Sequence, residues 1–581
     1  MKYTSYQFQY LAIFAFGVLL FSNVGCQQAV DVVQEKIKPY EIQQSAVFDS
    51  TAVVSAHPLA SEIGKDILRQ GGNAIDATIA VHFALAVVCP RAGNIGGGGF
   101  MIVRTAAGES AALDYREKAP AAATTDMYLD SLGNVIPDIS RKGHLAVGVP
   151  GTVDGMIKAH AKFGKMKRFG DLVAPAVKLA TEGYQISKTE ADRLNEYQDE
   201  FRKFQSETSP FIKSEAWKSG DLLVQKDLGK TLKRIENQGR AGFYAGETAD
   251  LLVKEMERGG GIITKADLEN YSSVWRKPII GDYKNYRIIS MPPPSSGGIC
   301  LLQILEGVED YPLAEYGFQS PQSIHLITEA ERRAYADRAE HLGDSDFYPV
   351  PLEKLSNPDY IRERMSDYND KMATPSDSIL AGNINIAPES FETTHTSVID
   401  AEGNAVSVTT TLNLNYGSKV IVEGAGFLLN DEMDDFSAKP GVPNFFGLVG
   451  AEANKIEPNK RMLSSMTPTI IEKDGKLFMV LGSPGGSTII TSVFQVFINV
   501  AEYEMSLPEA VAAKRFHHQW LPNTIMTEAN MSIDTTALKA MGHVIDPKKR
   551  IGLVKAIQVL PEGRLSVSGD PRHADDDVAG W

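Results

Sequence analysis

Residues 393–413, which read TTHTSVIDAEGNAVSVTTTLN, are the segment that most constrains how this chain can fold. Two β-rich runs flank a Gly403-Asn404 turn signal, and this pattern predicts an antiparallel hairpin. Threonines gather at both ends of the hairpin: Thr393, Thr394 and Thr396 at its start, and Thr409, Thr410 and Thr411 near its end. Because β-branched residues suit a pleated surface, a purely structural role explains this pattern.

Thr393 also permits a chemical interpretation. A threonine hydroxyl is a poor nucleophile unless a base lies beside it, and cleavage of the chain before Thr393 would supply that base as a new α-amine. The reference pKa of an α-amine is about 7.7–8.0, so a useful fraction is neutral near pH 7. This is the chemistry of an N-terminal-nucleophile amidase. The pattern alone favours the structural role, and the rest of the chain is needed to decide.

The chain resembles the γ-glutamyltranspeptidase family from about Thr51 to Gly580. From Thr393 onward the resemblance is carried by TTHTSVID, NAVSVTTTLN, NDEMDDFSAKPGVPN, PNKRMLSSMTPTI, GSPGGS and RFHHQW. Upstream it continues in GGNAIDATIA, GNIGGGGFM, LDYREKAP and GVPGTVDGM. These runs are long, ordered and mutually spaced, so they are far more specific than a single Gly-rich loop.

The resemblance implies an α+β fold, a four-layer αββα sandwich of the N-terminal-nucleophile hydrolase type. It also implies that a large subunit, residues 51–392, and a small subunit, residues 393–581, build one intertwined globular domain. The sequence itself predicts several antiparallel hairpins and amphipathic helices. A natural way to bury both is to stack sheet on sheet with helices outside.

Matching positions assign the catalytic residues. Thr393 corresponds to the family's nucleophile, which implies self-processing between Glu392 and Thr393. Thr411 corresponds to the residue whose hydroxyl bonds the nucleophile, although a cross-strand threonine pair would also account for it. Gly485 and Gly486 in GSPGGS correspond to the oxyanion-hole glycines, whose conformational freedom lets backbone N–H groups point inward. A phosphate loop is disfavoured because the lysine of GxxxxGK[ST] is missing.

Further positions match those that hold the ends of a γ-glutamyl donor. Arg116 corresponds to the residue that binds the α-carboxylate, which a guanidinium can hold through two parallel bonds. Ser464 and Ser465 correspond to serines that add donors there. Asn413, Glu432 and Asp435 correspond to positions around the α-ammonium, with Asp434 a weaker candidate. By residue type alone, Arg116 would be a surface ion pair and the acidic run a solvated turn.

Residues Pro440–Gly450 match the lid loop over the glutamyl pocket. Phe446 stands where many bacterial relatives carry a tyrosine whose hydroxyl can bond the Asn413 equivalent. The phenylalanine keeps the apolar cover and lacks that bond, so we expect a looser gate with altered donor access or an altered ratio of transfer to hydrolysis.

The leading hypothesis is γ-glutamyl transfer and hydrolysis. Thr393 would take the γ-glutamyl group from glutathione or a related amide, and water or the amine of an amino acid or dipeptide would release it. A cephalosporin (glutaryl) acylase is one alternative, but its acyl group lacks the α-amine that Asn413, Glu432 and Asp435 suit. A poly-γ-glutamate-processing relative would lack the long lid. An inactive peptide-binding surface lipoprotein would require a lost catalytic element.

Composition limits the partners. The chain has 581 residues with 58 basic and 73 acidic side chains, giving a net charge of −15, which argues against nucleic acid. The three cysteines form no CxxC and there is no HExxH, so no metal or cofactor is predicted. The adjacent histidines His517 and His518 are interpreted as structural, and Cys89 and Cys300 as small buried thiols.

The N-terminus predicts export. Residues 1–25 are interpreted as a signal peptide, because Leu11–Phe21 is an apolar run too short to span a bilayer comfortably. Gly25-Cys26 follows, so lipidation at Cys26 would make the protein an outer-membrane-anchored lipoprotein; otherwise it would be periplasmic. Residues 26–50 are interpreted as a polar tether.

Periodicity predicts several further elements. Helices are expected from Leu59 to Gly71-Gly72, over 73–88, from a Thr152 cap to Gly164, over 172–183 and over 320–341. A hairpin is expected over 100–116, and turn signals mark two more at Asp474-Gly475 and Glu562-Gly563. Residues 187–280 are predicted to be a largely helical peripheral layer. Residues 366–392 lose periodicity and are predicted to be a mobile segment.

Overall fold

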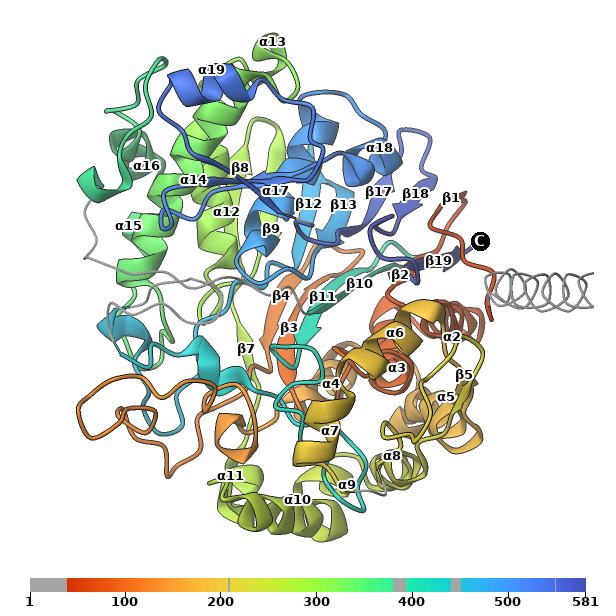
Figure 1. Cartoon of the computed structure of the whole chain (residues 1–581). Coiled ribbons are helices and arrows are strands. Elements are labelled where there is room, and N and C mark those ends of the chain that lie inside the picture. Colours follow the sequence, from red (N-terminus) through yellow and green to blue (C-terminus); the bar gives the residue numbers. More distant parts are fainter. Residues whose placement is uncertain (1–38, 207–208, 380–392, 440–450, 549) are drawn as a thin grey trace, which may run out of the picture.

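Two stacked seven-stranded sheets lie between two layers of helices (Figure 1). The computed structural model describes residues 39–206, 209–379, 393–439, 451–548 and 550–581. This arrangement confirms the predicted αββα sandwich. Each sheet takes strands from both sides of residue 392, so the two halves of the chain are intertwined in one domain.

The first sheet has the order β1-β18-β17-β13-β12-β9-β8, and all of its neighbours are antiparallel. Its strands are β1 (Ser45–Phe48), β8 (Ile279–Tyr283), β9 (Tyr286–Ser290), β12 (Thr469–Lys473), β13 (Lys476–Gly482), β17 (Lys555–Val559) and β18 (Leu565–Ser568). The turns at Asp474-Gly475 and Glu562-Gly563 join β12 to β13 and β17 to β18, as predicted.

The second sheet has the order β19-β2-β10-β11-β3-β4-β7 and carries the threonine hairpin at its centre. Its strands are β2 (Ala52–Ser55), β3 (Gly98–Arg104), β4 (Ser110–Asp114), β7 (Val274–Arg276), β10 (Thr394–Ile399), β11 (Ala405–Thr411) and β19 (Asp577–Gly580). Both hairpins predicted here, β3–β4 and β10–β11, are confirmed. Two small sheets complete the fold: β14 (Phe516–His517) with β15 (Ile525–Glu528) and β16 (Ile545–Lys548), and β5 (Tyr184–Gln185) with β6 (Leu222–Leu223).

Helices cover the outer face of each sheet. Against the second sheet and beyond it lie α2 (Pro58–Arg69), α3 (Ala74–Val88), α4 (Thr152–Phe163), α5 (Phe169–Glu182), α6 (Lys188–Glu196), α7 (Gln198–Phe204), α8 (Lys226–Gln238), α9 (Ala241–Tyr244), α10 (Gly246–Gly259) and α11 (Lys265–Asn270). On the side of the first sheet lie α12 (Gly297–Glu309), α13 (Leu313–Tyr316), α14 (Pro321–His341), α15 (Leu352–Leu355), α16 (Pro358–Arg364), α17 (Thr488–Ala501), α18 (Leu507–Ala512) and α19 (Thr535–Ala540).

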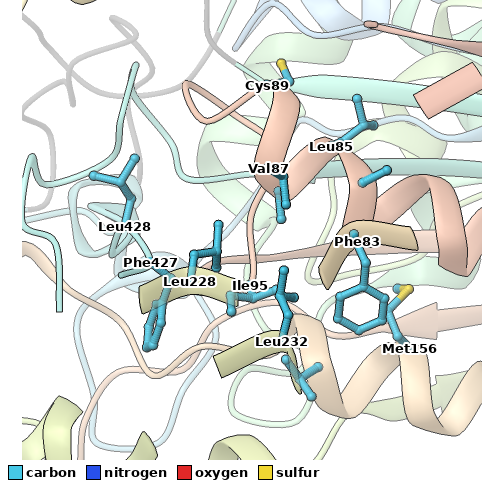
Figure 2. Packing of buried hydrophobic residues seen from close by; sticks show 14 of the residues in the cluster. Phe83, Leu85, Val87, Cys89, Ile95, Met156, Leu228, Leu232, Phe427 and Leu428 are labelled. Carbon is cyan, nitrogen blue, oxygen red and sulfur yellow. The ribbon is translucent and has the colours of Figure 1, made fainter. Parts of the chain in front are cut away.

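Three buried apolar clusters fill the three interfaces between these layers. On β3, Phe100 and Ile102 point between the sheets, whereas Met101 and Val103 point toward the helices, as strand alternation requires. Helix α3 is buried along its whole length, so it is the innermost helix of its layer. Figure 2 shows Phe83, Leu85 and Val87 of this helix in the cluster that also holds Leu228 and Phe427.

Most of the helices predicted from periodicity are confirmed within a few residues. Asn73 caps α3 through a capping box, Gly183 follows α5, and Ser320 caps α14. The stretch 187–280 is largely helical, as predicted. Cys89 and Cys300 are buried free thiols, also as predicted.

Three local predictions are wrong. Residues 45–48, assigned to the tether, form the edge strand β1, whose four residues are too short to give a sequence signal. Thr152 is not a helix cap, because its hydroxyl donates instead to Asn94 Oδ1 at 2.8 Å. Residues 366–379, assigned to a mobile segment, are anchored: Ser376 is buried and its hydroxyl donates to the Trp520 carbonyl at 2.6 Å.

Other predictions lie outside the described residues. These are the signal peptide, the tether before residue 39, Cys26, residues 380–392 including Glu392, and the lid loop 440–450 with Phe446. In the part of the chain that the structure describes, no helix is both long and apolar enough to cross a membrane.

The glycine run 96–99 lets the backbone of β3 approach its neighbours closely. A Cβ placed on Gly97 would lie 2.2 Å from the Thr411 carbonyl oxygen, and one on Gly99 would lie 2.4 Å from that of Thr409. Asn94 reinforces this contact, since its side chain accepts from Gly97 N and donates to the Thr411 carbonyl. Residues 96–99 are therefore close backbone packing, as predicted, and they fix the end of β11.

We expect Gly97→Ala to destabilise the protein by about 1–3 kcal/mol, because the added methyl group would push against backbone that cannot move aside. Thermal unfolding of the purified protein measures this. Gly307→Ala in α12 is the matched control, since its new Cβ would lie no closer than 3.2 Å to any atom. Equal stability of the Gly97 variant and the wild type would contradict this packing.

Candidate active site

The β10–β11 ladder places Thr393 beside Thr411. Its register pairs Thr394 with Thr410, so Thr393 and Thr411 are the next opposed positions at the end of the hairpin. Both side chains are about 4% exposed, and both line one pocket. Thr411 Oγ1 also accepts from Asn413 N at 2.7 Å, which fixes its position as β11 ends.

One pocket at this end of the sandwich gathers nearly all of the residues predicted from the sequence. Its predicted lining residues are Arg116, Thr393, Thr411, Asn413, Glu432, Asp435, Ser464, Ser465 and Gly486. The remaining predicted residue, Gly485, immediately precedes the lining residue Gly486 in the chain. The residues come from strand ends and loops that are separated by hundreds of positions in the sequence, so the fold is what brings them together.

Arg116 is the centre of a buried ion cluster in this pocket. Its Nη1 lies 2.6 Å from Glu432 Oε2 and 3.6 Å from Glu117 Oε2, and its Nη2 pairs with Asp435. The backbone of Arg116 is fixed as well, since its N–H donates to Asp114 and its carbonyl accepts from the Tyr271 hydroxyl. The arginine and the acids that were predicted to hold opposite ends of a donor are therefore paired with each other in this structure.

One guanidinium cannot neutralise the three carboxyl groups around it. Burial raises the pKa of Glu117 to about 8, and it also raises the pKa values of Glu432 and Asp435, although Arg116 opposes each shift. Glu432 and Asp435 in turn help to raise the pKa of Arg116 against the effect of its own burial. The three carboxyl groups therefore tend to keep protons. A cation that entered the pocket would favour their ionised forms.

The remaining polar residues hold the loops that frame the pocket. Asn413 adopts a left-handed conformation (φ 75°), and its side chain donates to the Asp431 carbonyl. Ser464 Oγ accepts from Met466 N at 3.1 Å. Asp434 accepts from the Ser140 hydroxyl and does not line this pocket, in keeping with its ranking below Asp435.

The loop before α17 presents two glycines with positive φ, Gly485 at 143° and Gly486 at 54°. Their carbonyl groups accept from Thr488 and Ile489 at the start of the helix. Neither of their N–H groups donates to an acceptor within the described residues. A loop of this kind can offer backbone donors to a developing oxyanion.

Sequence reasoning missed four residues that line the pocket: Arg338, Leu463, Met466 and Ile489. Leu463 and Met466 adjoin predicted residues within LSSMTP, and Ile489 lies two positions after GSPGGS, so these motifs could have suggested them. Arg338 lies on α14, far in sequence from every motif used, and its residue type gives no signal of its own.

Of the described residues, one group has a geometry that could hold a metal ion: His325, Glu329 and His543. Its ligand atoms already have protein partners. His325 Nδ1 and His543 Nε2 lie 2.7 Å apart in a hydrogen bond, and Arg332 and Arg333 bind the Glu329 carboxylate. His517 is likewise engaged, by Thr491 and Gln519. These contacts indicate structural roles for the pair His325 and His543 and for His517.

Comparison with known proteins finds relatives that are similar in sequence and in fold. Residues 60–580 match the sequence profile of the gamma-glutamyltranspeptidase family. A glutathione hydrolase proenzyme from Escherichia coli is 48% identical over 533 residues, covering 91% of each chain. A gamma-glutamyltranspeptidase structure from Helicobacter pylori has 48% identity and a TM-score of 0.55, and the match covers 60% of this chain and 97% of that one. A cephalosporin acylase from Bacillus halodurans has 25% identity and a TM-score of 0.79, with 94% and 98% covered.

The raised pKa of Glu117 predicts how stability changes with pH. In the folded protein Glu117 keeps its proton up to about pH 8, whereas the unfolded chain releases it near the usual value of 4.5. Folding therefore becomes less favourable as pH rises between these values. We expect Glu117→Gln to reduce this decline by about 1 kcal/mol or more. Unfolding midpoints measured from pH 5 to 8 for both proteins test this, and identical slopes would contradict it.

Proposed function

The chain belongs to the γ-glutamyltranspeptidase family, and from this premise we propose how its residues carry out the reaction. The activity is γ-glutamyl transfer and hydrolysis by an enzyme that matures through self-processing of its precursor. The family uses a threonine nucleophile. We assign that role to Thr393 and the processing cut to the bond between Glu392 and Thr393, which would leave a large subunit of residues 51–392 and a small subunit of residues 393–581.

In the proposed first step, Thr393 Oγ attacks the γ-carbonyl carbon of the donor while its hydroxyl proton passes to the α-amine of the same residue. The carbonyl oxygen becomes an oxyanion that the N–H groups of Gly485 and Gly486 stabilise. Thr411, at the opposed ladder position, orients the nucleophile. The intermediate collapses to a γ-glutamyl ester on Thr393, and the leaving amine departs with the proton.

In the second step, water or an acceptor amine attacks the ester. Its proton passes to the α-amine of Thr393, and the Thr393 hydroxyl is restored as the product leaves. Glutathione and related γ-glutamyl compounds are the donors, and we propose that amino acids or dipeptides are the acceptors.

The observation that carries the donor assignment is the buried pairing of Arg116 with Glu432 and Asp435 in the Thr393 pocket. A γ-glutamyl group ends in a zwitterion, whose α-carboxylate suits Arg116, Ser464 and Ser465 and whose α-ammonium suits Asn413, Glu432 and Asp435. Because the donor end is a zwitterion, exchanging the internal ion pairs of Arg116 for pairs with the donor leaves the net charge of the pocket unchanged. A glutaryl group brings no cation, so it would leave the two acids uncompensated, which argues against the acylase alternative.

The assignment of Thr393 is tested by intact mass spectrometry of the purified protein. We expect the wild type to yield two chains, the smaller beginning at Thr393, whereas Thr393→Ala stays uncut and loses more than about 10³-fold of its γ-glutamyl-p-nitroanilide hydrolysis. Thr394→Ala is the matched control, because the buried Thr394 hydroxyl has no hydrogen-bond partner within the described residues; it should mature and remain active. An uncut wild type would favour the inactive peptide-binding lipoprotein, and normal processing of Thr393→Ala would refute the assignment.

We also propose that the protein is exported and lipidated at Cys26, on the strength of the apolar run that ends at Gly25-Cys26. Globomycin treatment of expressing cells should then cause the unprocessed precursor to accumulate. Cys26→Ser should abolish lipid labelling and leave the γ-glutamyl activity of the soluble enzyme intact. Processing that globomycin does not affect, with a mature N-terminus elsewhere, would contradict lipidation and leave simple periplasmic export.

A further inference from the structure

Arg338 is a second arginine in the donor pocket, and none of the roles assigned above uses it. It lies in the last turn of α14, is about 4% exposed, and lines the same pocket as Thr393 and Arg116. Helix α14 precedes the proposed processing site, so Arg338 would belong to the large subunit.

The guanidinium of Arg338 is bound to the serine loop. Its Nη2 donates to Ser465 Oγ at 3.2 Å, and its Nε donates to Ser296 Oγ at 3.0 Å. Ser296 holds the neighbouring residue, since its hydroxyl and its N–H donate to the Ser464 carbonyl at 2.7 and 2.8 Å. Arg338 therefore fixes the position of both serines, directly at Ser465 and through Ser296 at Ser464.

The charge of Arg338 has no close counter-ion. Arg116 is paired with acids, but among the described residues no carboxylate lies within 4.0 Å of Arg338, whose side chain donates to the hydroxyl groups of Ser296 and Ser465. Burial lowers the pKa of Arg338, and the charge of Asp435 is among the influences that oppose this shift. A buried charge without a partner is costly, so its presence beside an open pocket points to an anionic ligand.

The hydrogen bond from Arg338 also determines what Ser465 can do. A serine hydroxyl has one proton and two acceptor lone pairs. Because Arg338 donates to Ser465 Oγ, one lone pair is occupied and the proton has to go elsewhere. Among the described residues it has no acceptor, and Ser465 lines the pocket. The Ser465 O–H group is thus held as a donor toward whatever anion occupies the pocket.

We propose that Arg338 is a positioning residue for the α-carboxylate of the donor: it orients the Ser465 hydroxyl toward that carboxylate and supplies the uncompensated positive charge that draws it in. This inference rests on the proposed function of the pocket. It makes donor selection depend on two arginines with different tasks. Arg116 exchanges its acidic partners for the carboxylate, whereas Arg338 acts through its hydrogen bond to the Ser465 hydroxyl.

The test compares wild type, Arg338→Met and Arg338→Lys as mature two-chain enzymes. For Arg338→Met we expect the KM for γ-glutamyl-p-nitroanilide to rise about 10- to 100-fold, the range for a lost hydrogen bond to a charged group. The kcat should stay within about threefold, since no reacting atom is touched. Arg338→Lys keeps the charge but cannot reach both serines, so its KM should lie between the other two.

Three competitive inhibitors separate carboxylate recognition from a general loss of structure. L-Glutamate has both the α-carboxylate and the α-ammonium, glutarate lacks the ammonium, and 4-aminobutyrate lacks the α-carboxylate. Arg338→Met should raise the inhibition constants of glutamate and glutarate and leave that of 4-aminobutyrate unchanged. Ser465→Ala should produce the same pattern, and the double variant should be little worse than either single variant because the two residues act as one unit.

An unchanged KM in Arg338→Met, or an equal rise for 4-aminobutyrate, would overturn the inference. If Arg338→Met fails to mature, the same comparison is made with Arg338→Lys, for which an unchanged glutamate constant is the contradicting result. Failure of the proposed function looks different, because the wild type itself would neither hydrolyse γ-glutamyl-p-nitroanilide nor bind glutamate.

Discussion

The antiparallel pairing of β10 with β11 is the interaction on which the rest of this structure depends. It places Thr393, which directly precedes the central strand β10, opposite Thr411. The hairpin is central because β2 pairs with β10 on one side and β3 with β11 on the other. The glycines at and just before the start of β3 allow the second contact, since any side chain at Gly97 would strike the backbone of Thr411. A nucleophile on a rigid strand end is held more precisely than one on a loop, which suits catalysis that depends on position.

Charged side chains line the other side of the pocket. Arg116 pairs with Glu432 and Asp435 in a buried cluster, so the site presents both signs of charge to a ligand that carries both. Arg338 adds a positive charge that no acid within 4.0 Å compensates in the described part of the chain, and it donates to the pocket residue Ser465. One turn earlier on α14, Tyr335 donates to the carbonyl of Ser487, which follows Gly485 and Gly486 in the chain. A single helix that precedes Thr393 in the chain thus supports two loops that follow it.

Local sequence patterns were enough to predict several elements of the fold, whereas the pocket residues could be predicted only through longer motifs. Hairpins at Gly403-Asn404, Asp474-Gly475 and Glu562-Gly563 could be predicted because a turn signal between alternating runs is a local property. The pocket residues could be predicted only through motifs, since Arg116 and Ser464 meet through the packing of strand ends far apart in the chain. Arg338 lay in no such motif. The strand β1 and the anchored segment around Ser376 were missed because their stability comes from distant partners, β18 and Trp520.

In the mechanism proposed above, Thr393 carries the γ-glutamyl group during turnover. The most direct test is covalent labelling of the mature enzyme with a γ-glutamyl diazoketone, followed by peptide mapping by mass spectrometry. We expect one label per enzyme, on the peptide that begins at Thr393, and protection from labelling by excess L-glutamate. A label on Thr411 or any other residue, or labelling that glutamate does not prevent, would contradict it.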